Sequence, residues 1–205
     1  MGLTLTVRPS LGLVLLPQSQ SWHDPQSELT FPYSGYGRTY LHFDNYFVDR
    51  QRLAAEWLEQ HAPKDAVVAA TPAGSIAYHT HLRVIDMLGL NDVHIAHTAN
   101  VPIGWHRAGH EKGDGRYVLS RAPDFILLGN VAVLSKALTE ADMARKLVRT
   151  SEHEIWADPA FHRDYELVTV QLEPEGMFRY FSFYKKRTLH LARSFEARHT
   201  QYSLK

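Results

Sequence analysis

The sequence predicts an α/β domain with three layers, a mostly parallel sheet and a C-terminal antiparallel hairpin at one edge. Three short apolar runs, at 66–70, 83–88 and 124–128, are separated by helices or long connections, and this spacing favours parallel neighbouring strands. Two aromatic and β-branched runs follow at 165–172 and 177–185, joined by the turn sequence Glu-Pro-Glu-Gly. That pattern predicts the hairpin.

Helices are expected between the strands. The segment Asp49–His61 has four apolar residues at helical spacing, with charged residues outside that stripe, and Asp49 is expected to cap its start. The four residues are Leu53, Ala54, Trp57 and Leu58. Further short helices are expected after the turn 71–75, over 115–121, and after Thr139, which forms a variant capping box with Asp142.

The chain divides into three parts. Residues 1–40 are an N-terminal apolar stub and linker, residues 41–187 form the α/β domain, and residues 188–205 are a C-terminal extension. The apolar run 11–16 partly fits a signal peptide, but the stub of a membrane helix or a plain strand fits as well. No run reaches the ~18–20 apolar residues that a membrane-spanning helix needs.

Composition excludes several classes of function. Acidic and basic residues balance at 22 each, so no overall charge attracts nucleic acid, and none is expected as a partner. The chain has no cysteine, which excludes disulfides and thiolate catalysis. The 44% apolar and 21% charged fractions are those of an ordinary globular protein.

A candidate binding site lies in the connection between the second and third predicted strands. Ligands of open parallel sheets bind beyond the carboxyl ends of the strands, and this connection, 88–115, is unusually long and polar. The candidate binding residues are Asp86, Asn91, Asp92, Trp105, His110, Glu111 and Lys112. The expected arrangement brings Asp86 and the loop 109–115 together, with no catalytic residue assigned.

Each of these features also has a structural interpretation. Asp86 can cap a neighbouring loop by accepting backbone amides. The segment Gly109–Gly115 (GHEKGDG) can be a polar loop in which Asp114 caps the following helix. Its glycines allow backbone to approach either backbone or a ligand. The sequence leaves both alternatives open.

No metal or cofactor is expected. Six histidines fall between His79 and His110, but the pairs they form do not build the three or four converging ligands of a zinc site. The sequence contains no nucleophile elbow and no phosphate- or dinucleotide-binding glycine motif. The strand-to-helix turn Thr71–Ser75 is a weak signal for an anion.

Several strings resemble the soluble C-terminal domain of bacterial multi-spanning glycosyltransferases. These are C-type, polyprenyl-phosphate-sugar-dependent enzymes similar to mycobacterial arabinofuranosyltransferases. The likeness covers about residues 45–185. The strings are Val84–Asp92, His94–Ala96, Gly109–Gly113, Tyr117–Leu119 and Ala122–Leu128.

The resemblance implies a soluble tail domain on the extracytoplasmic (periplasmic) face of the bacterial cytoplasmic membrane. Its partners would be a membrane glycosyltransferase core, in the same or a neighbouring polypeptide, and a glycan or polyprenyl-phosphate sugar. In that family the catalytic carboxylate lies between the first membrane helices, so no catalytic residue carries over. The alternatives are an acid–base or metal-assisted hydrolase using Asp86, His110 and Glu111, and a carbohydrate-binding module using Trp57, Trp105 or Tyr78.

Overall fold

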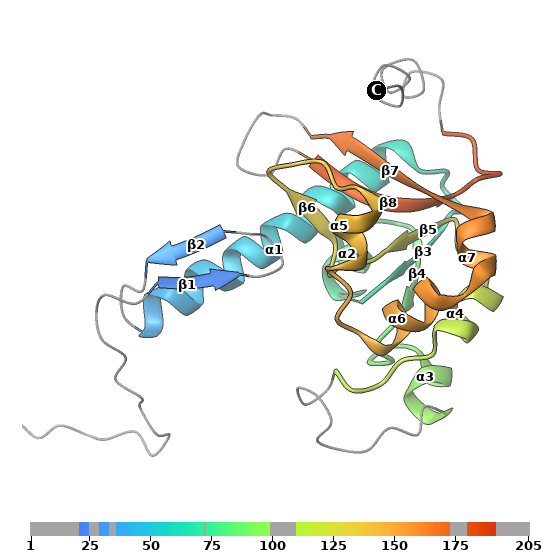
Figure 1. The fold of residues 1–205 in the computed structure, drawn as a ribbon, viewed down its shortest axis with the longest axis horizontal. Coiled ribbons are helices and arrows are strands. Elements are labelled where there is room, and N and C mark those ends of the chain that lie inside the picture. The colour runs from blue at the N-terminus through green and yellow to red at the C-terminus, as the bar shows by residue number, and fades with distance from the viewer. Residues whose placement is uncertain are drawn as a thin grey trace, which may run out of the picture.

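A computed structural model describes residues 21–24, 29–32, 36–71, 73–98, 110–172 and 180–191. Mixed helices and strands make it an α/β domain (Figure 1). The strands are β1 (Ser21–Asp24), β2 (Leu29–Pro32), β3 (Val67–Ala70), β4 (Arg83–Asp86), β5 (Phe125–Leu127), β6 (Ala132–Leu134), β7 (Tyr165–Gln171) and β8 (Tyr180–Lys186). The helices are α1 (Tyr36–His61), α2 (Ala73–His79), α3 (Val93–Thr98), α4 (Gly115–Ser120), α5 (Glu140–Ala144), α6 (Thr150–Ala157) and α7 (Pro159–Asp164).

The main sheet has a parallel half and an antiparallel half. β3 lies between β4 and β5 and is parallel to both, which confirms the parallel neighbours expected from the three apolar runs. β8 continues the sheet antiparallel to β5 and also pairs with β6 and β7. The sheet is therefore open and mixed.

β7 and β8, the two C-terminal strands, lie side by side at one end of the sheet, and β7 is the outer strand. β7 pairs with β8 along its whole length, from Tyr165↔Lys186 to Gln171↔Tyr180. β5 and β6 share the other side of β8, because they pair with different parts of it. β8 is therefore flanked on both sides, and β6 is a strand that the sequence analysis did not predict.

The connection between β5 and β6 is a left-handed turn. Gly129, Asn130 and Val131 have φ angles of 62°, 59° and 62°, a conformation that costs energy for a β-branched residue such as valine. Two buried charged side chains hold the turn. Arg50 donates to the Val131 carbonyl at 3.0 Å, and the Glu152 carboxylate accepts from the Asn130 amide at 3.3 Å.

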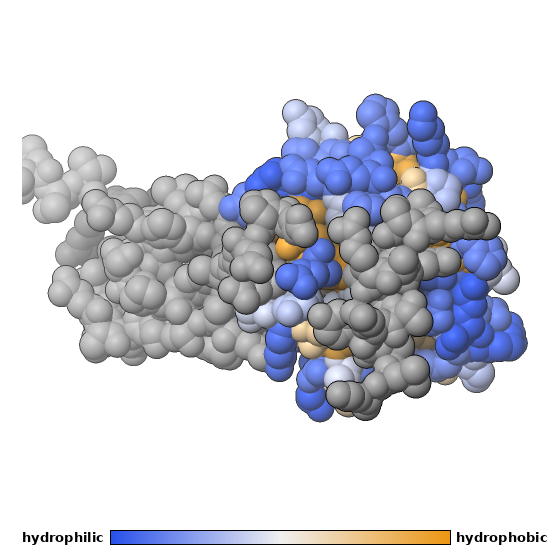
Figure 2. Space-filling view, turned by 90° about the horizontal axis from the view of Figure 1, so that it is seen from above, coloured by the Kyte–Doolittle hydropathy of each residue, from blue (hydrophilic) through white to orange (hydrophobic). Residues whose placement is uncertain are grey.

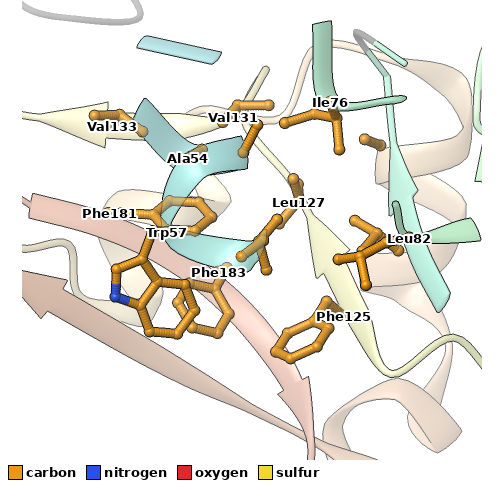
Figure 3. Close-up of a cluster of buried hydrophobic side chains, with 14 of the residues drawn as sticks. Ala54, Trp57, Ile76, Leu82, Phe125, Leu127, Val131, Val133, Phe181 and Phe183 are labelled. Atoms are coloured by element: carbon orange, nitrogen blue, oxygen red, sulfur yellow. The ribbon is translucent and has the colours of Figure 1, made fainter. Parts of the chain in front are cut away.

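Alternating strand residues fill two hydrophobic clusters, one on each face of the sheet. On one face α1 and α2 cover a cluster that includes Phe125, Leu127, Phe181 and Phe183 (Figure 3). On the other face Ile126 and other strand residues pack against α3 to α7. Of the helices on the second face, the sequence analysis predicted α4 and α5 but not α3, α6 and α7.

The first helix is longer than expected. α1 begins at Tyr36, so Asp49 lies inside the helix and does not cap it, and the helix begins before the domain start placed at residue 41. β1 and β2 pair antiparallel within the segment interpreted as a linker. The capping box of Thr139 and Asp142 at the start of α5 is confirmed.

Polar residues predominate on the part of the described surface that Figure 2 shows. Figure 2 shows hydrophilic side chains over much of the described surface in that view, with smaller hydrophobic areas between them. Among the described residues, no helix has both the length and the apolar character needed to cross a membrane.

Candidate functional site

Asp86 holds the turn that follows β4. Its side chain is 3% exposed. Oδ1 accepts from the Leu88 amide at 2.9 Å and Oδ2 accepts from the Asn91 amide at 2.7 Å. Both carboxylate oxygens therefore bind backbone, which confirms the interpretation of Asp86 as a loop-capping residue. Asn91 contributes its backbone amide to that turn.

Ser151, at the start of α6, joins the β4 end to the loop before α4. Its hydroxyl donates to the Met87 carbonyl at 2.7 Å and accepts from the Asp114 amide at 3.1 Å. Ser151 is fully buried. The loop and the turn of Asp86 thus lie at the same edge of the sheet, and a helix that the sequence analysis did not predict connects them.

The glycines of the loop are needed for contact with α6. A Cβ on Gly113 would lie 2.6 Å from the Ser151 nitrogen, and one on Gly115 would lie 2.6 Å from the Glu154 Cβ. The Gly115 amide also donates to the Glu154 carboxylate at 2.6 Å. These two glycines therefore allow backbone to approach backbone, the structural alternative of the sequence analysis. Gly109 lies outside the described residues.

The charged residues of the loop are half-buried and make local contacts. The His110 amide donates to the Glu111 carboxylate at 3.1 Å, and the Thr150 hydroxyl lies 3.4 Å from the Glu111 carbonyl oxygen. The Lys112 ammonium donates to the Ala96 carbonyl in α3, which ties the loop to the region just after β4. Trp105 lies outside the described residues.

Five polar side chains gather where α3 meets α4; we call them the α3–α4 cluster. Its members are Asp92, His94, Asp114, Tyr117 and Arg121. The His94 and Tyr117 rings stack with centroids 3.9 Å apart. The Tyr117 hydroxyl donates to Asp92 at 3.1 Å and accepts from Arg121 at 3.3 Å, while His94 Nε2 lies 3.0 Å from the Asp114 carboxylate.

Two of the cluster's carboxylates also begin helices. Asp92 accepts from the Ile95 amide in α3 at 3.1 Å. Asp114 is the N-cap of α4 and accepts from the Tyr117 amide at 2.8 Å, as the structural interpretation of the loop expected. Because each carboxylate has one oxygen on a backbone amide and the other on a side chain, the cluster is rigidly placed.

The cluster offers both donors and acceptors at the surface. Burial, followed by the hydrogen bond to Asp92, raises the pKa of Tyr117, so the phenol stays protonated and donates. The side chains of His94 and Asp114 are 41% and 30% exposed. The neighbouring apolar residues Leu90 and Val93 are exposed. Carboxylates, a guanidinium and ring edges beside apolar surface suit a ligand rich in hydroxyl groups.

Two residues of the carbohydrate-binding alternative fall in opposite environments. Trp57 is 7% exposed and packs against Phe181 and Phe183, so it belongs to the core and is not a sugar-stacking platform. Tyr78 on α2 is 84% exposed. In the part of the chain that the structure describes, no three His, Asp or Glu side chains group so as to hold a metal ion.

One family model, described as Domain of unknown function (DUF8728), matches residues 43–198. The chain belongs to this family. No curated protein and no solved structure matches it.

The DUF8728 region runs from inside α1 to beyond β8, so it contains both hydrophobic clusters and the α3–α4 cluster. Three residues that organise its sheet edge were not singled out from the sequence: Ser151, Glu152 and Glu154. Serine and glutamate near a helix start are common capping residues, so the sequence carried only a weak signal for them.

Proposed function

We propose that this domain is the soluble tail of a membrane glycosyltransferase and helps to bind the acceptor glycan or the lipid-linked sugar donor. It would be a three-layer α/β unit on the extracytoplasmic face of the bacterial membrane. The membrane core that transfers the sugar would be part of the same or a neighbouring polypeptide. The α3–α4 cluster would contact the ligand.

The observation that carries this proposal is the place of the resembling strings in the fold. They correspond to β4 with its turn, α3, the loop before α4, α4 itself and β5, and the α3–α4 cluster lies within that segment. The cluster is partly exposed and combines acceptors, donors and ring edges, a combination that hydroxyl-rich ligands need.

The hydrolase alternative has weaker support. Proton exchange requires a carboxylate that can reach its substrate, and both oxygens of the buried Asp86 are occupied by backbone amides. One observation supports the carbohydrate-binding alternative: the Tyr78 side chain is exposed, as stacking on a sugar requires. This alternative differs from the leading proposal in needing no membrane partner.

Binding of two probes to the purified chain tests the proposal. Arabinofuranose oligosaccharides and a short-chain polyprenyl phosphate would be titrated while backbone NMR resonances are followed, and shifts should concentrate in α3 and α4. Asp92→Asn should weaken binding about tenfold, the effect of losing one hydrogen bond to a charged group. Asparagine still caps a helix, so the fold should survive.

Asp65→Asn is the matched control, because Asp65 is exposed in the turn after α1 and should leave binding unchanged. Equal loss in both variants, or no binding of either probe, would refute the role of the cluster.

The purified chain alone should transfer no sugar from a polyprenyl-phosphate donor, and measured transfer would overturn its assignment as a tail domain. A reporter fused to the chain in its native host should be active outside the cytoplasm.

A further inference from the structure

Three of the buried polar side-chain atoms that lack a hydrogen-bond partner among the described residues belong to residues with no ionisable group. They are Nε2 of Gln51 in α1, Oγ1 of Thr71 just after β3, and Oγ of Ser75 in α2. Gln51 and Thr71 are 4% and 2% exposed. Buried polar atoms in folded proteins nearly always have partners, because leaving one without a hydrogen bond is costly. Three such atoms on elements that contact one another therefore call for an explanation.

The three atoms come from facing elements. α1 and α2 pack along each other, and the contact between Glu59 and His81 fixes their relative position. The Glu59 carboxylate accepts from the His81 amide at 2.8 Å, and its other oxygen lies 2.6 Å from His81 Nδ1. Gln51 and Ser75 each lie about two turns before this contact along the chain, which is the basis for placing them near each other.

This place is the carboxyl end of the parallel strands. Thr71 directly follows β3, and Val131 lies just beyond β5, where its carbonyl accepts from Arg50. Ala54 of α1, Ile76 of α2 and Val131 belong to the same hydrophobic cluster (Figure 3). In the sequence, Ala54 lies within one helical turn of Gln51, and Ile76 is next to Ser75. β3 leads into α2 on one face and β4 into α3 on the other, and open sheets bind ligands at such switch points.

We propose that Gln51, Thr71 and Ser75 form a binding site for an oxyanion, a phosphate or carboxylate group of a small ligand. The amide nitrogen of glutamine only donates, and both hydroxyls can donate, so the matching ligand supplies acceptor oxygens. The guanidinium of Arg50 adds a positive charge nearby. Asp86, whose strand position pairs with Ala70, has both oxygens on its own turn and does not compete.

This site is separate from the α3–α4 cluster and does not rest on the proposed function. If the chain binds phosphate but neither sugar probe, the result supports this site, and the glycosyltransferase proposal is still decided by its own test. Failure of either test is therefore visible independently of the other.

The test is calorimetric titration of the full chain with inorganic phosphate, acetate and methyl glucoside. Saturable binding of phosphate or acetate, but not of the neutral glucoside, is expected, and the two anions distinguish a phosphate from a carboxylate ligand. Thr71→Val should weaken anion binding at least about tenfold, as expected for a hydrogen bond to a charged group. Thr71→Ser keeps the hydroxyl and should bind as the native chain does.

Thr80→Val is the matched control. Thr80 is also buried, but its hydroxyl donates to the Ile76 carbonyl at 2.8 Å, so the same substitution there should leave anion binding unchanged. The proposal is overturned if the native chain binds neither anion, if Thr71→Val binds as tightly as the native chain, or if a crystal grown with phosphate shows only an ordered water on the three groups. Circular dichroism of each variant verifies that it is folded.

Discussion

Replacing Gly115 with alanine tests whether the loop before α4 is held by α6. The new Cβ would lie 2.6 Å from the Glu154 Cβ and 2.8 Å from the Ile155 nitrogen. Atoms this close must separate, and both belong to or adjoin the backbone of α6. Moving the loop away would also stretch the 2.6 Å hydrogen bond between the Gly115 amide and the Glu154 carboxylate.

Two costs add to give the expected loss of stability. Forcing a methyl group into a packed site costs ~1–3 kcal/mol, and weakening a hydrogen bond to a charged group costs up to ~1.5–3 kcal/mol. The higher helix propensity of alanine returns ~0.5–1 kcal/mol. The free energy of unfolding should therefore fall by ~2–4 kcal/mol, which corresponds to a decrease in Tm of about 5–15 °C for a domain of this size.

Urea unfolding followed by tryptophan fluorescence measures this change. Gly74→Ala is the control, because a Cβ on Gly74 meets nothing within 4 Å and Gly74 lies in α2. That variant should be unchanged or more stable by up to ~1 kcal/mol. Equal midpoints for Gly115→Ala and the native chain, or an equal loss at Gly74, would contradict the packing described for the loop.

Three further changes test the charged groups of the fold. Asp86→Asn should lower the free energy of unfolding by ~1–3 kcal/mol in urea, because an amide nitrogen would face a backbone N–H; an unchanged midpoint would contradict its capping role. Glu152→Ala should cost at least as much, since it removes the buried carboxylate that accepts from the backbone amides of Asn130, Val148 and Arg149; native stability in this variant would show that the left-handed turn does not depend on Glu152. Hydrogen bonds from the hydroxyl and the amide of Thr139 lower the pKa of Asp142 from its ordinary value of 3.8 to about 2. Because the folded pKa is the lower one, the stabilisation is present above pH ~4 and is lost as the pH falls towards 2. The stability difference between the native chain and Asp142→Ala should shrink over that range, whereas a constant difference would refute the linkage.

The parallel half of the sheet was predictable because β3 and β5 are buried on both faces. Runs such as 66–70 are apolar at every position, which strands with one solvated face are not. The capping residues Thr139 and Asp114 were predictable as well, since a polar side chain before a helix satisfies local amides. These features depend on residues near each other in the chain.

Features that depend on distant residues were not predictable. β6 has only three residues, and its pairing with β8 depends on the turn at Gly129–Val131, which is anchored by Arg50 and Glu152 from two different helices. A valine in a left-handed conformation gives no signal in the sequence.

At the carboxyl edge of the sheet, the polar groups that follow β3, β4 and β5 differ in whether they have hydrogen-bond partners within the described residues. At β4 the Asp86 carboxylate closes its own turn. At β5 the turn is closed by Arg50 on one face and Glu152 on the other. Within the described residues, β3 is followed instead by the unpartnered hydroxyls of Thr71 and Ser75. Because the other two strand ends are satisfied internally, a ligand at this edge would gain most hydrogen bonds at β3, so binding there and binding at the α3–α4 cluster can be separated by mutation.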